Sequence, residues 1–399
     1  SQGETTDEKD TDTVITNRDK DTASSHTVTI NANGKNDKVE VTLKDVNIEA
    51  NSGPALTSKG DVTLTLKGEN HLTGGNGGRY GGSGITSNGS LTITGGENDS
   101  LTAQGGSSAD GGSGSYGGDG IGSSSGGLTI SGGTVNAAGG SGSYGGSGIC
   151  SSSDDLTISG GTVNAAGGSG SYGGSGIYSR GGLTISGGTV TANGGGDGSN
   201  VRSGSGITSN GGVTISGGTV NAAGGSGSYG GNGIYSRSSL TSGSLELTAK
   251  AGSPSGRVLS QNGDELDLNT IKDKLGPGAK VTTTDANGKV NQVSIPRPVE
   301  SEKPVIPEES SSSSDGGSAA PSAPASPLPG LTVTDKDGQR ISYTSTQSGN
   351  TLTVCVGRLT ASFRISLAAL RQLRAEGIET IAFQTILCST TLSLDELLA

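Results

Sequence analysis

Short runs in which apolar and polar residues alternate recur along most of the chain, separated by Gly, Asn or Ser. From residue 126 to 150 the sequence reads GGLTISGGTVNAAGGSGSYGGSGIC, and close copies start at Asp154, Gly181 and Gly211. Each copy holds three strand-like segments: Leu-Thr-Ile, Thr-Val-Asn-Ala, and Gly-Ile followed by a small residue or Tyr. Three short strands in every repeat are typical of one coil of a parallel β-helix, in which successive repeats stack.

The alternation predicts which side chains fill the interior, because successive strand residues point to opposite faces. We expect five side chains of this repeat to point inward: Leu128, Ile130, Val135, Ala137 and Ile149. The intervening Thr, Ser and Asn side chains then point outward. No repeat can bury its apolar face alone, so neighbouring coils about 4.8 Å apart must complete the core.

The spacing of the repeats sets the extent of the β-helix. The Leu-Thr-Ile segments begin at positions 91, 128, 156, 183 and 213, and weaker copies precede and follow them. We therefore predict about eight coils over residues 26–262, preceded by a disordered polar tail over residues 1–25. Gly pairs recur at one place in the repeat and predict corners with positive φ: Gly132-Gly133, Gly160-Gly161, Gly187-Gly188 and Gly217-Gly218.

The remainder of the chain changes character. Residues 263–296 predict a short helix and a hairpin that cap the solenoid, and the Pro- and Ser-rich residues 297–330 predict an extended linker. Residues 331–399 show strand patterns around one amphipathic helix and predict a small α+β module. The predicted fold class is thus an all-β parallel β-helix followed by a linker and this module.

Composition and charge exclude several classes of protein. The 399 residues include 76 Gly, two Phe and neither Trp nor Met, too few large apolar side chains for one globular core of this length. The net charge of −11 disfavours nucleic-acid binding, which requires Lys and Arg to neutralise phosphates. No run approaches the roughly 20 apolar residues that span a bilayer, so we expect no membrane insertion. Cys355 and Cys388 lie on neighbouring predicted segments, and only their separation decides whether they pair.

The segments HTVTI, VEVTLKDVNI and GDVTLTLKGENHLTGG, together with the repeated LTISGGTVNAAGG and GSGI, carry a family resemblance over roughly residues 26–262. This combination resembles the carbohydrate-binding-domain-containing parallel β-helix proteins, which are secreted or surface proteins of anaerobic Gram-positive bacteria. The resemblance implies a right-handed parallel β-helix, an extracellular or cell-surface location and binding of a plant or host polysaccharide. It also implies calcium sites in some members.

A tyrosine recurs at the same point of the Gly-rich segment that follows the second strand of the repeat. If the coils stack in register, these rings line one edge: Tyr80, Tyr116, Tyr144, Tyr172 and Tyr229. A phenol ring packs against the C–H face of a sugar while its hydroxyl bonds sugar hydroxyls, so the row is the leading candidate glycan site. The alternative is that the rings stack on one another and order the Gly-rich segments. Asn200, Val201 and Arg202 interrupt the row.

A second candidate glycan site comes from the sequence I-Y-S-R, which occurs twice. It places Tyr178 beside Arg180, and Tyr235 beside Arg237. An Arg next to a Tyr suits the carboxylate of a uronic acid. The alternative is a solvated Arg that covers the edge of an aromatic ring.

Five aspartates in the otherwise charge-poor repeats are candidate oxygen ligands for calcium: Asp110, Asp119, Asp154, Asp155 and Asp197. Their spacing matches no calcium-loop signature.

These observations favour a secreted or cell-surface bacterial protein that binds a polysaccharide or a host or bacterial glycan without catalysis, in the manner of an adhesin. The first alternative is a structural stalk or spacer that binds no glycan specifically and displays the last module, which is then a candidate for binding a protein partner. A polysaccharide lyase or hydrolase is the third alternative and ranks last. Such an enzyme requires clustered acids or a base, and the acids of this chain are scattered over different coils.

Overall fold

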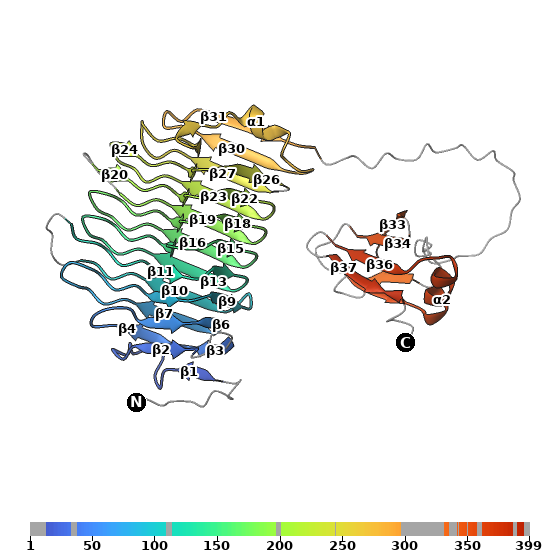
Figure 1. Cartoon of the computed structure of the whole chain (residues 1–399), viewed down its shortest axis with the longest axis horizontal. Coiled ribbons are helices and arrows are strands. Elements are labelled where there is room, and N and C mark those ends of the chain that lie inside the picture. Colours follow the sequence, from blue (N-terminus) through green and yellow to red (C-terminus); the bar gives the residue numbers. More distant parts are fainter. Residues whose placement is uncertain are drawn as a thin grey trace, which may run out of the picture. The chain divides into compact units, whose positions relative to one another are not determined.

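The structure is a computed structural model in which the chain forms two compact units, Ser1–Glu302 and Lys303–Ala399. It describes residues 13–32, 38–108, 114–196, 201–243, 245–296, 331–334, 341, 343–348, 350–356, 361–385 and 389–394. The first unit is a parallel β-solenoid built from three long sheets (Figure 1). The predicted fold class is therefore confirmed. The predicted linker over 297–330 lies outside the described residues.

Sheet 1 holds the Leu-Thr-Ile strands, in register from coil to coil, with Leu128 beside Leu156 and Ile130 beside Ile158. Its nine strands are β1 (Val14–Thr16), β3 (Lys38–Lys44), β6 (Asp61–Lys67), β9 (Leu91–Gly95), β12 (Leu128–Ile130), β15 (Leu156–Ile158), β18 (Leu183–Ile185), β22 (Val213–Ile215) and β26 (Leu240–Ser242).

Sheet 2 holds the Thr-Val-Asn-Ala strands and is also in register, with Val135 beside Val163. Its parallel strands are β4 (Asn47–Glu49), β7 (Glu69–Thr73), β10 (Ser100–Gln104), β13 (Thr134–Ala138), β16 (Thr162–Ala166), β19 (Thr189–Asn193), β23 (Thr219–Ala223), β27 (Glu246–Lys250) and β30 (Lys280–Thr284), and antiparallel β31 (Val290–Ser294) ends it.

Sheet 3 holds the strands that begin with the Gly-Ile segment, with Ile149 beside Ile177. Its parallel strands are β2 (Val28–Asn31), β5 (Leu56–Lys59), β8 (Ile85–Asn88), β11 (Ile121–Ser125), β14 (Ile149–Ser151), β17 (Ile177–Ser179), β21 (Ile207–Ser209), β25 (Ile234–Ser236) and β28 (Leu259–Gln261), and antiparallel β29 (Asp264–Glu265) ends it.

Each sheet therefore stacks nine parallel strands, one more than the eight coils predicted. In sheet 2 the additional parallel strand is β30, which pairs with β27 and lies in the region predicted as the C-terminal cap. In sheet 1 it is β1 at the start of the chain, which pairs with β3, and nearby Ser24 forms a β-bridge with Ile48. These residues were predicted to belong to a disordered tail because they show no apolar periodicity. An edge strand needs only backbone pairing, and Val14 is 53% exposed although it lies in the sheet. Residues 1–12 of the predicted tail lie outside the described residues.

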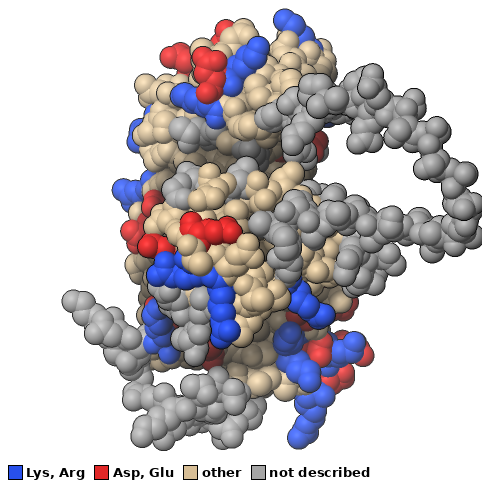
Figure 2. Space-filling model, turned by 90° about the vertical axis from the view of Figure 1, so that its right-hand side faces the viewer, with Lys and Arg blue, Asp and Glu red and all other residues tan. Residues whose placement is uncertain are grey.

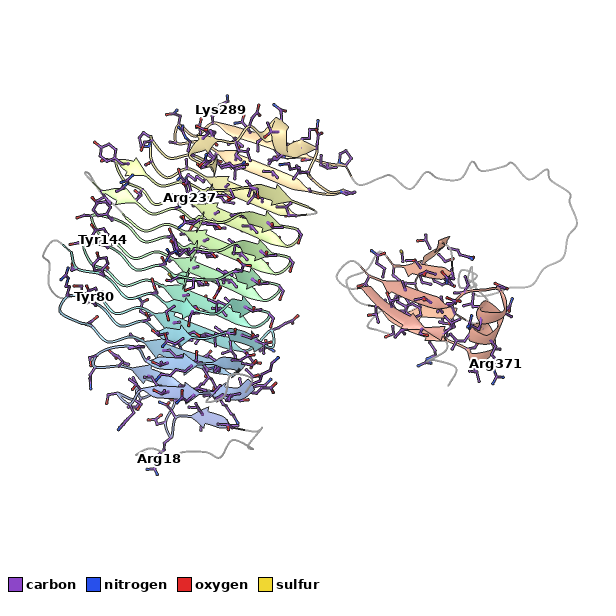
Figure 3. All side chains as sticks on the ribbon, viewed as in Figure 1. Arg18, Tyr80, Tyr144, Arg237, Lys289 and Arg371 are labelled. Carbon is purple, nitrogen blue, oxygen red and sulfur yellow. The ribbon has the colours of Figure 1, made fainter. Side chains whose placement is uncertain are left out.

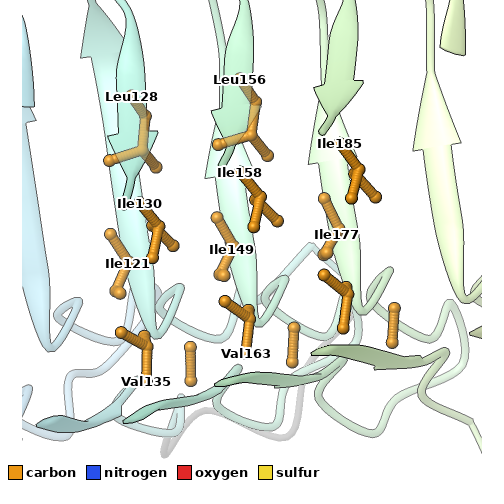
Figure 4. Packing of buried hydrophobic residues seen from close by; sticks show 14 of the residues in the cluster. Ile121, Leu128, Ile130, Val135, Ile149, Leu156, Ile158, Val163, Ile177 and Ile185 are labelled. Carbon is orange, nitrogen blue, oxygen red and sulfur yellow. The ribbon is translucent and has the colours of Figure 1, made fainter. Parts of the chain in front are cut away.

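Columns of equivalent aliphatic side chains, mostly Leu, Ile, Val and Ala, fill the interior (Figure 4). The five side chains predicted to point inward are between 0 and 2% exposed: Leu128, Ile130, Val135, Ala137 and Ile149. The same positions repeat along the core, so that each aliphatic side chain stacks on its equivalent in the next coil. The core is therefore a narrow continuous column, which explains how a chain with so few aromatic residues folds.

A column of buried serines completes the interior, and the sequence pattern did not reveal it. Each of these serines follows the core Ile of sheet 3 by two residues, as Ser151 follows Ile149. The hydroxyl of Ser151 donates to the carbonyl of Asp154 at 2.7 Å, and that of Ser179 donates to the carbonyl of Gly182 at 2.9 Å. From Ser87 to Ser236 the column thus satisfies carbonyl groups of the turn that leads from sheet 3 to sheet 1, whereas the buried hydroxyl of Ser58 has no hydrogen-bond partner among the described residues.

The end of the solenoid carries the short helix and hairpin expected over residues 263–296. Helix α1 (Leu268–Lys272) begins at Asp267, whose side chain accepts a hydrogen bond from the backbone N–H of Asn269, and it buries Ile271. Strands β30 and β31 form the antiparallel hairpin. Because β31 and β29 run antiparallel to the coils, parallel stacking ends here.

The second unit combines strands with one helix. Strand β32 (Leu331–Thr334) pairs with β35 (Ser362–Ile365), and a second sheet has the order β33 (Thr344–Ser348), β34 (Thr351–Cys355), β36 (Thr380–Gln384) and β37 (Ser389–Ser393). Helix α2 (Leu367–Ala375) buries Leu370 and Leu373. No helix within the described residues is long and apolar enough to cross a membrane.

Candidate functional site

The candidate site lies where each coil leaves sheet 2 and returns to sheet 3. In the coil of β13 the chain runs outward through Gly139 and Gly140, turns at Tyr144, and returns through Gly145 and Gly146. We call these two Gly-rich stretches and their equivalents in other coils the glycine arms. They form the row of long loops at one side of the coils (Figure 1).

A continuous chain of backbone hydrogen bonds joins the glycine arms. The N–H of Gly146 donates to the carbonyl of Gly140 within one coil at 2.9 Å, and the N–H of Gly140 donates to Gly118 of the preceding coil at 2.7 Å. The same alternation links twelve glycines by hydrogen bonds of 2.7 to 2.9 Å: Gly225, Gly204, Gly195, Gly174, Gly168, Gly146, Gly140, Gly118, Gly106, Gly82, Gly75 and Gly53. The arms are therefore a hydrogen-bonded layer and extend the order of the three sheets.

Close packing of backbone against backbone explains why the arms contain glycine. A Cβ atom on Gly146 would lie 2.0 Å from the carbonyl oxygen of Gly118, and a Cβ on Gly140 would lie 2.0 Å from that of Gly106. Neither residue has a positive φ. At the predicted corners only the second glycine of each pair has a positive φ: Gly133, Gly161, Gly188 and Gly218 have φ between 77 and 81°. The prediction was therefore wrong for the first glycine of each pair, Gly132, Gly160, Gly187 and Gly217, and positive φ also occurs at other turn glycines, such as Gly60 and Gly126. Most of the glycine excess thus has a cause that the sequence analysis did not identify.

The glycine arms carry a row of tyrosines in register, as predicted, and Figure 3 labels Tyr80 and Tyr144 at this outer edge. The ring centroids are 5.4 Å apart for Tyr80 and Tyr116, 4.8 Å for Tyr116 and Tyr144, and 4.7 Å for Tyr144 and Tyr172. The planes of each pair lie within 10 to 12° of parallel. We call Tyr80, Tyr116, Tyr144 and Tyr172 the tyrosine ladder.

Backbone hydrogen bonds between neighbouring coils fix the positions of the tyrosines of the ladder. The N–H of Tyr144 donates to the carbonyl of Ser115 at 2.9 Å, and the carbonyl of Tyr144 accepts from the N–H of Gly117 at 2.8 Å. Below the rings, the hydroxyl of the buried Ser115 donates to that of Ser143 at 3.2 Å. The ring spacing therefore follows from the spacing of the coils.

Stacking determines which part of each ring faces solvent. The four side chains of the ladder are 62, 40, 37 and 45% exposed in chain order. Tyr116 and Tyr144 have a neighbouring ring on both faces, and the guanidinium of Arg79 lies over Tyr80 at 5.6 Å from the ring centroid. The exposed area of Tyr116 and Tyr144 is therefore mainly ring edge.

Beyond Tyr172 an arginine takes the place of a ring. The backbone of Arg202 forms a parallel β-bridge with that of Tyr172. Arg202 also pairs with Tyr229 in the two-stranded sheet of β20 (Arg202–Ser203) and β24 (Tyr229–Gly230). The backbone row thus continues through Arg202, while the aromatic stack ends at Tyr172. Tyr229 is 60% exposed and lies next to Arg202 instead of another tyrosine.

The second predicted site does not form a stack. Thr208 lies between Tyr178 and Tyr235 in sheet 3, so the two rings are two coils apart. The hydroxyl of Tyr178 accepts a hydrogen bond from the side-chain amide of Asn210 at 2.9 Å. Arg180 and Arg237 are both exposed, and Figure 3 shows Arg237 away from the edge that carries Tyr80 and Tyr144.

The structure does not bring the described candidate calcium ligands together. Asp154 and Asp155 are exposed, and Asp155 accepts a hydrogen bond from the N–H of Gly182 at 2.6 Å. Asp119 lies one coil earlier and accepts from the N–H of Ser147 at 2.7 Å. Within the described residues, no group of three His, Cys, Asp or Glu side chains is placed to hold a metal ion. Asp110 and Asp197 lie outside the described residues.

Asp119 and Cys150 form a partly buried pair on adjacent coils. Burial raises the pKa of Asp119 to about 6, although hydrogen bonds from the backbone of Ser147 and the thiol of Cys150 act in the opposite direction. Burial and the neighbouring Asp119 raise the pKa of Cys150. Cys150 therefore carries a protonated, unreactive thiol at neutral pH.

In the second unit Cys355 is a free thiol whose sulfur lies 3.4 Å from the side-chain oxygen of Gln384. Its predicted candidate partner, Cys388, lies outside the described residues.

Charged side chains of both signs are interspersed with uncharged surface on the face shown in Figure 2.

Comparison of the chain with protein-family models, curated proteins and solved structures gave no match.

Proposed function

We propose that the chain is a non-catalytic structural rod, secreted or displayed on a bacterial cell surface, that acts as a stalk for its small C-terminal unit. In this rod the tyrosine ladder stabilises the glycine arms against separation of neighbouring coils, a role that we call a brace. The observation that carries the proposal is that neighbouring rings cover both faces of Tyr116 and Tyr144.

Ring stacking bears directly on the choice between a brace and a sugar platform. A sugar that packs its C–H face on a phenol needs a free ring face. The two central rings have none, and Arg79 lies over Tyr80. Packing of sugars on the central ring faces is therefore disfavoured.

The brace stabilises the outermost part of the four coils that carry Tyr80, Tyr116, Tyr144 and Tyr172. Each stacked aromatic pair contributes about 0.5 to 1.5 kcal/mol beyond its buried area, so three pairs contribute roughly 1.5 to 4.5 kcal/mol. The hydrogen-bonded glycine arms beneath the rings contribute further order. A stalk requires this stiffness, because each coil of a solenoid contacts only its neighbours and one weak coil interrupts the rod.

Extracellular placement is supported by the resemblance of the repeats to secreted and surface β-helix proteins. Nine stacked coils and a separate second unit suit a stalk that carries a binding module. In this proposal a partner protein binds the second unit.

A second candidate function is glycan binding through the hydroxyl edge of the ladder. It is favoured by exposure: among the described residues, five of the eight exposed large apolar side chains are tyrosines of this row: Tyr80, Tyr116, Tyr144, Tyr172 and Tyr229. Concentrated apolar exposure marks interaction surfaces. In this case the ligand is a polysaccharide whose hydroxyl groups bond the phenol hydroxyls, with or without calcium.

Two triple variants of the full chain separate these functions. In the first, Tyr116, Tyr144 and Tyr172 are replaced by Ala, and in the second by Phe. A brace predicts that the Ala variant loses several kcal/mol of stability and that the Phe variant, which retains the stack, stays near wild type in urea unfolding. It also predicts no saturable binding of the wild type to plant, host or bacterial glycan arrays, with or without calcium.

A different result would contradict the brace. Saturable binding of the wild type to one polysaccharide, lost in the Phe variant at unchanged stability, would show that the hydroxyl edge binds glycan and would overturn the brace as the main role. Tyr235→Ala is the matched control, because Tyr235 lies outside the ladder and next to Thr208.

A further inference from the structure

We infer that the tyrosine ladder is a site of oxidative modification, at which neighbouring phenols couple into dityrosine and join successive coils covalently. The modified atoms are the ring carbons ortho to each hydroxyl. The coupling takes place within one chain, between coils that already lie side by side.

Ring geometry supports coupling within the ladder. Tyr116, Tyr144 and Tyr172 present ring centroids 4.8 and 4.7 Å apart in nearly parallel planes. Their side chains are 37 to 45% exposed, so an oxidant reaches the ring edges and each ring has room to tilt toward its neighbour. Small rotations about the side-chain bonds then bring ortho carbons of adjacent rings into bonding range.

The coupling balances as a two-electron oxidation. Each of two phenols gives up one electron and one proton and becomes a phenoxyl radical. The two radicals form one carbon–carbon bond between ortho carbons, and the two ring hydrogens then move to the phenol oxygens as the rings regain aromaticity. Hydrogen peroxide, acting through a haem peroxidase, accepts the two electrons and two protons and becomes two molecules of water.

Composition directs the oxidation to these rings. The chain has no Met and no Trp, which elsewhere compete for oxidants, and the thiol of Cys150 is buried. The half-buried thiol of Cys355 is a competing site in the second unit, and the test therefore uses a chain carrying Cys355→Ser. Of the eight tyrosines, Tyr178 and Tyr235 are separated by Thr208, Tyr229 lies beside Arg202, and Tyr343 is buried in the second unit. Only the ladder places tyrosines in stacked pairs among the described residues.

The test treats the full chain at low concentration with hydrogen peroxide and a haem peroxidase, and follows dityrosine fluorescence and the cross-linked peptides by mass spectrometry. We expect cross-links between Tyr80 and Tyr116, between Tyr116 and Tyr144 and between Tyr144 and Tyr172, at a yield per chain that does not depend on protein concentration. The treated chain should also keep its β-sheet circular dichroism at urea concentrations that unfold the untreated chain.

Two conservative variants sharpen the test. Tyr144→Phe keeps a ring in the stack but removes two of the three stacked pairs, so only Tyr80 and Tyr116 can still couple. Four tyrosines form at most two dityrosines in one chain and the variant at most one, so the maximal yield should fall to about half. Tyr178→Phe should leave the yield unchanged. The inference is overturned if cross-links join separate chains in proportion to protein concentration, if Tyr178 couples as readily as Tyr144, or if the native chain couples no faster than the urea-unfolded chain.

Discussion

Replacing Gly146 by Ala tests whether the glycine arms are a packed layer. The added Cβ would lie 2.0 Å from the carbonyl oxygen and 2.5 Å from the carbonyl carbon of Gly118. Both are backbone atoms of the preceding coil, so no side chain can rotate away, and the two coils must separate by more than an ångström. We expect a large loss of stability although Gly146 lies outside the three sheets.

The magnitude follows from two contributions. Overpacking of a tight interior costs about 1 to 3 kcal/mol. The separation also breaks the hydrogen bond from Gly140 to Gly118 and strains the one from Gly146 to Gly140, each of which contributes about 1 kcal/mol. Together these contributions predict a loss of roughly 3 to 5 kcal/mol.

Gly127→Ala is the matched control. Its Cβ would have the carbonyl oxygen of Asp155 as its nearest neighbour, at an ordinary distance of 3.6 Å, and its φ is not positive. Replacement of Gly by Ala at such a position restricts the unfolded chain and stabilises by about 0.4 to 1 kcal/mol. The two variants carry the same chemical change, so they differ only in the space around the new methyl group.

Urea unfolding of the full chain, followed by tyrosine fluorescence, gives the comparison. Seven of the eight tyrosines lie in the first unit, so this signal reports mainly on the solenoid. Gly146→Ala should unfold at a clearly lower urea concentration than wild type, and Gly127→Ala at the same or a slightly higher one. Equal midpoints for the two variants would refute the packed-layer account.

Two further predictions concern the core and its titration. Ile130→Ala removes a fully buried side chain between Ile93 and Ile158 and should cost about 2 to 5 kcal/mol in urea unfolding, whereas the outward Thr129→Ala should change stability by less than about 0.5 kcal/mol. Burial raises the pKa of Asp119 from an ordinary 3.8 to about 6, so between these pH values the native state holds a proton that the unfolded state has lost. The stability of the native state is therefore highest below about pH 4 and falls as the pH rises through 6, by at most about 3 kcal/mol. Asp119→Asn should remove this dependence and raise stability at pH 7, and a variant whose stability falls with pH as steeply as wild type would contradict the assignment.

The repeat pattern made the solenoid core predictable. Leu128, Ile130 and Val135 alternate with polar residues, and so do their equivalents in every full repeat. The set of side chains that point inward therefore follows from strand geometry alone. The first coil escaped prediction because Val14 joins the sheet through its backbone and leaves its side chain exposed.

The glycine arms were not predictable in the same way. Whether a glycine turns the chain or admits a neighbouring backbone depends on the facing coil, and Gly133 and Gly146 look alike in the sequence although only Gly133 has a positive φ. One signal was present in the sequence: paired glycines recur on both sides of the tyrosines of this row, as Gly139-Gly140 and Gly145-Gly146 flank Tyr144, and a single turn needs fewer glycines.

The tyrosine row was predictable as a row but not as a stack. Register follows from the repeat, whereas the orientation of each ring depends on how closely Gly145 and its equivalents let the coils approach. Ring orientation in turn decides whether ring faces or ring edges meet solvent, and this distinction separates the brace from the sugar platform.

Amide hydrogen exchange of the full chain, read by mass spectrometry over residues 138–148, tests the central claim most directly. If the glycine arms form a hydrogen-bonded layer that braces the rod, their amides should exchange as slowly as those of the adjoining strands β13 and β14. Exchange at the rate of an unstructured chain would contradict the account, because arms that open freely hold neither the tyrosine ladder nor a stiff edge.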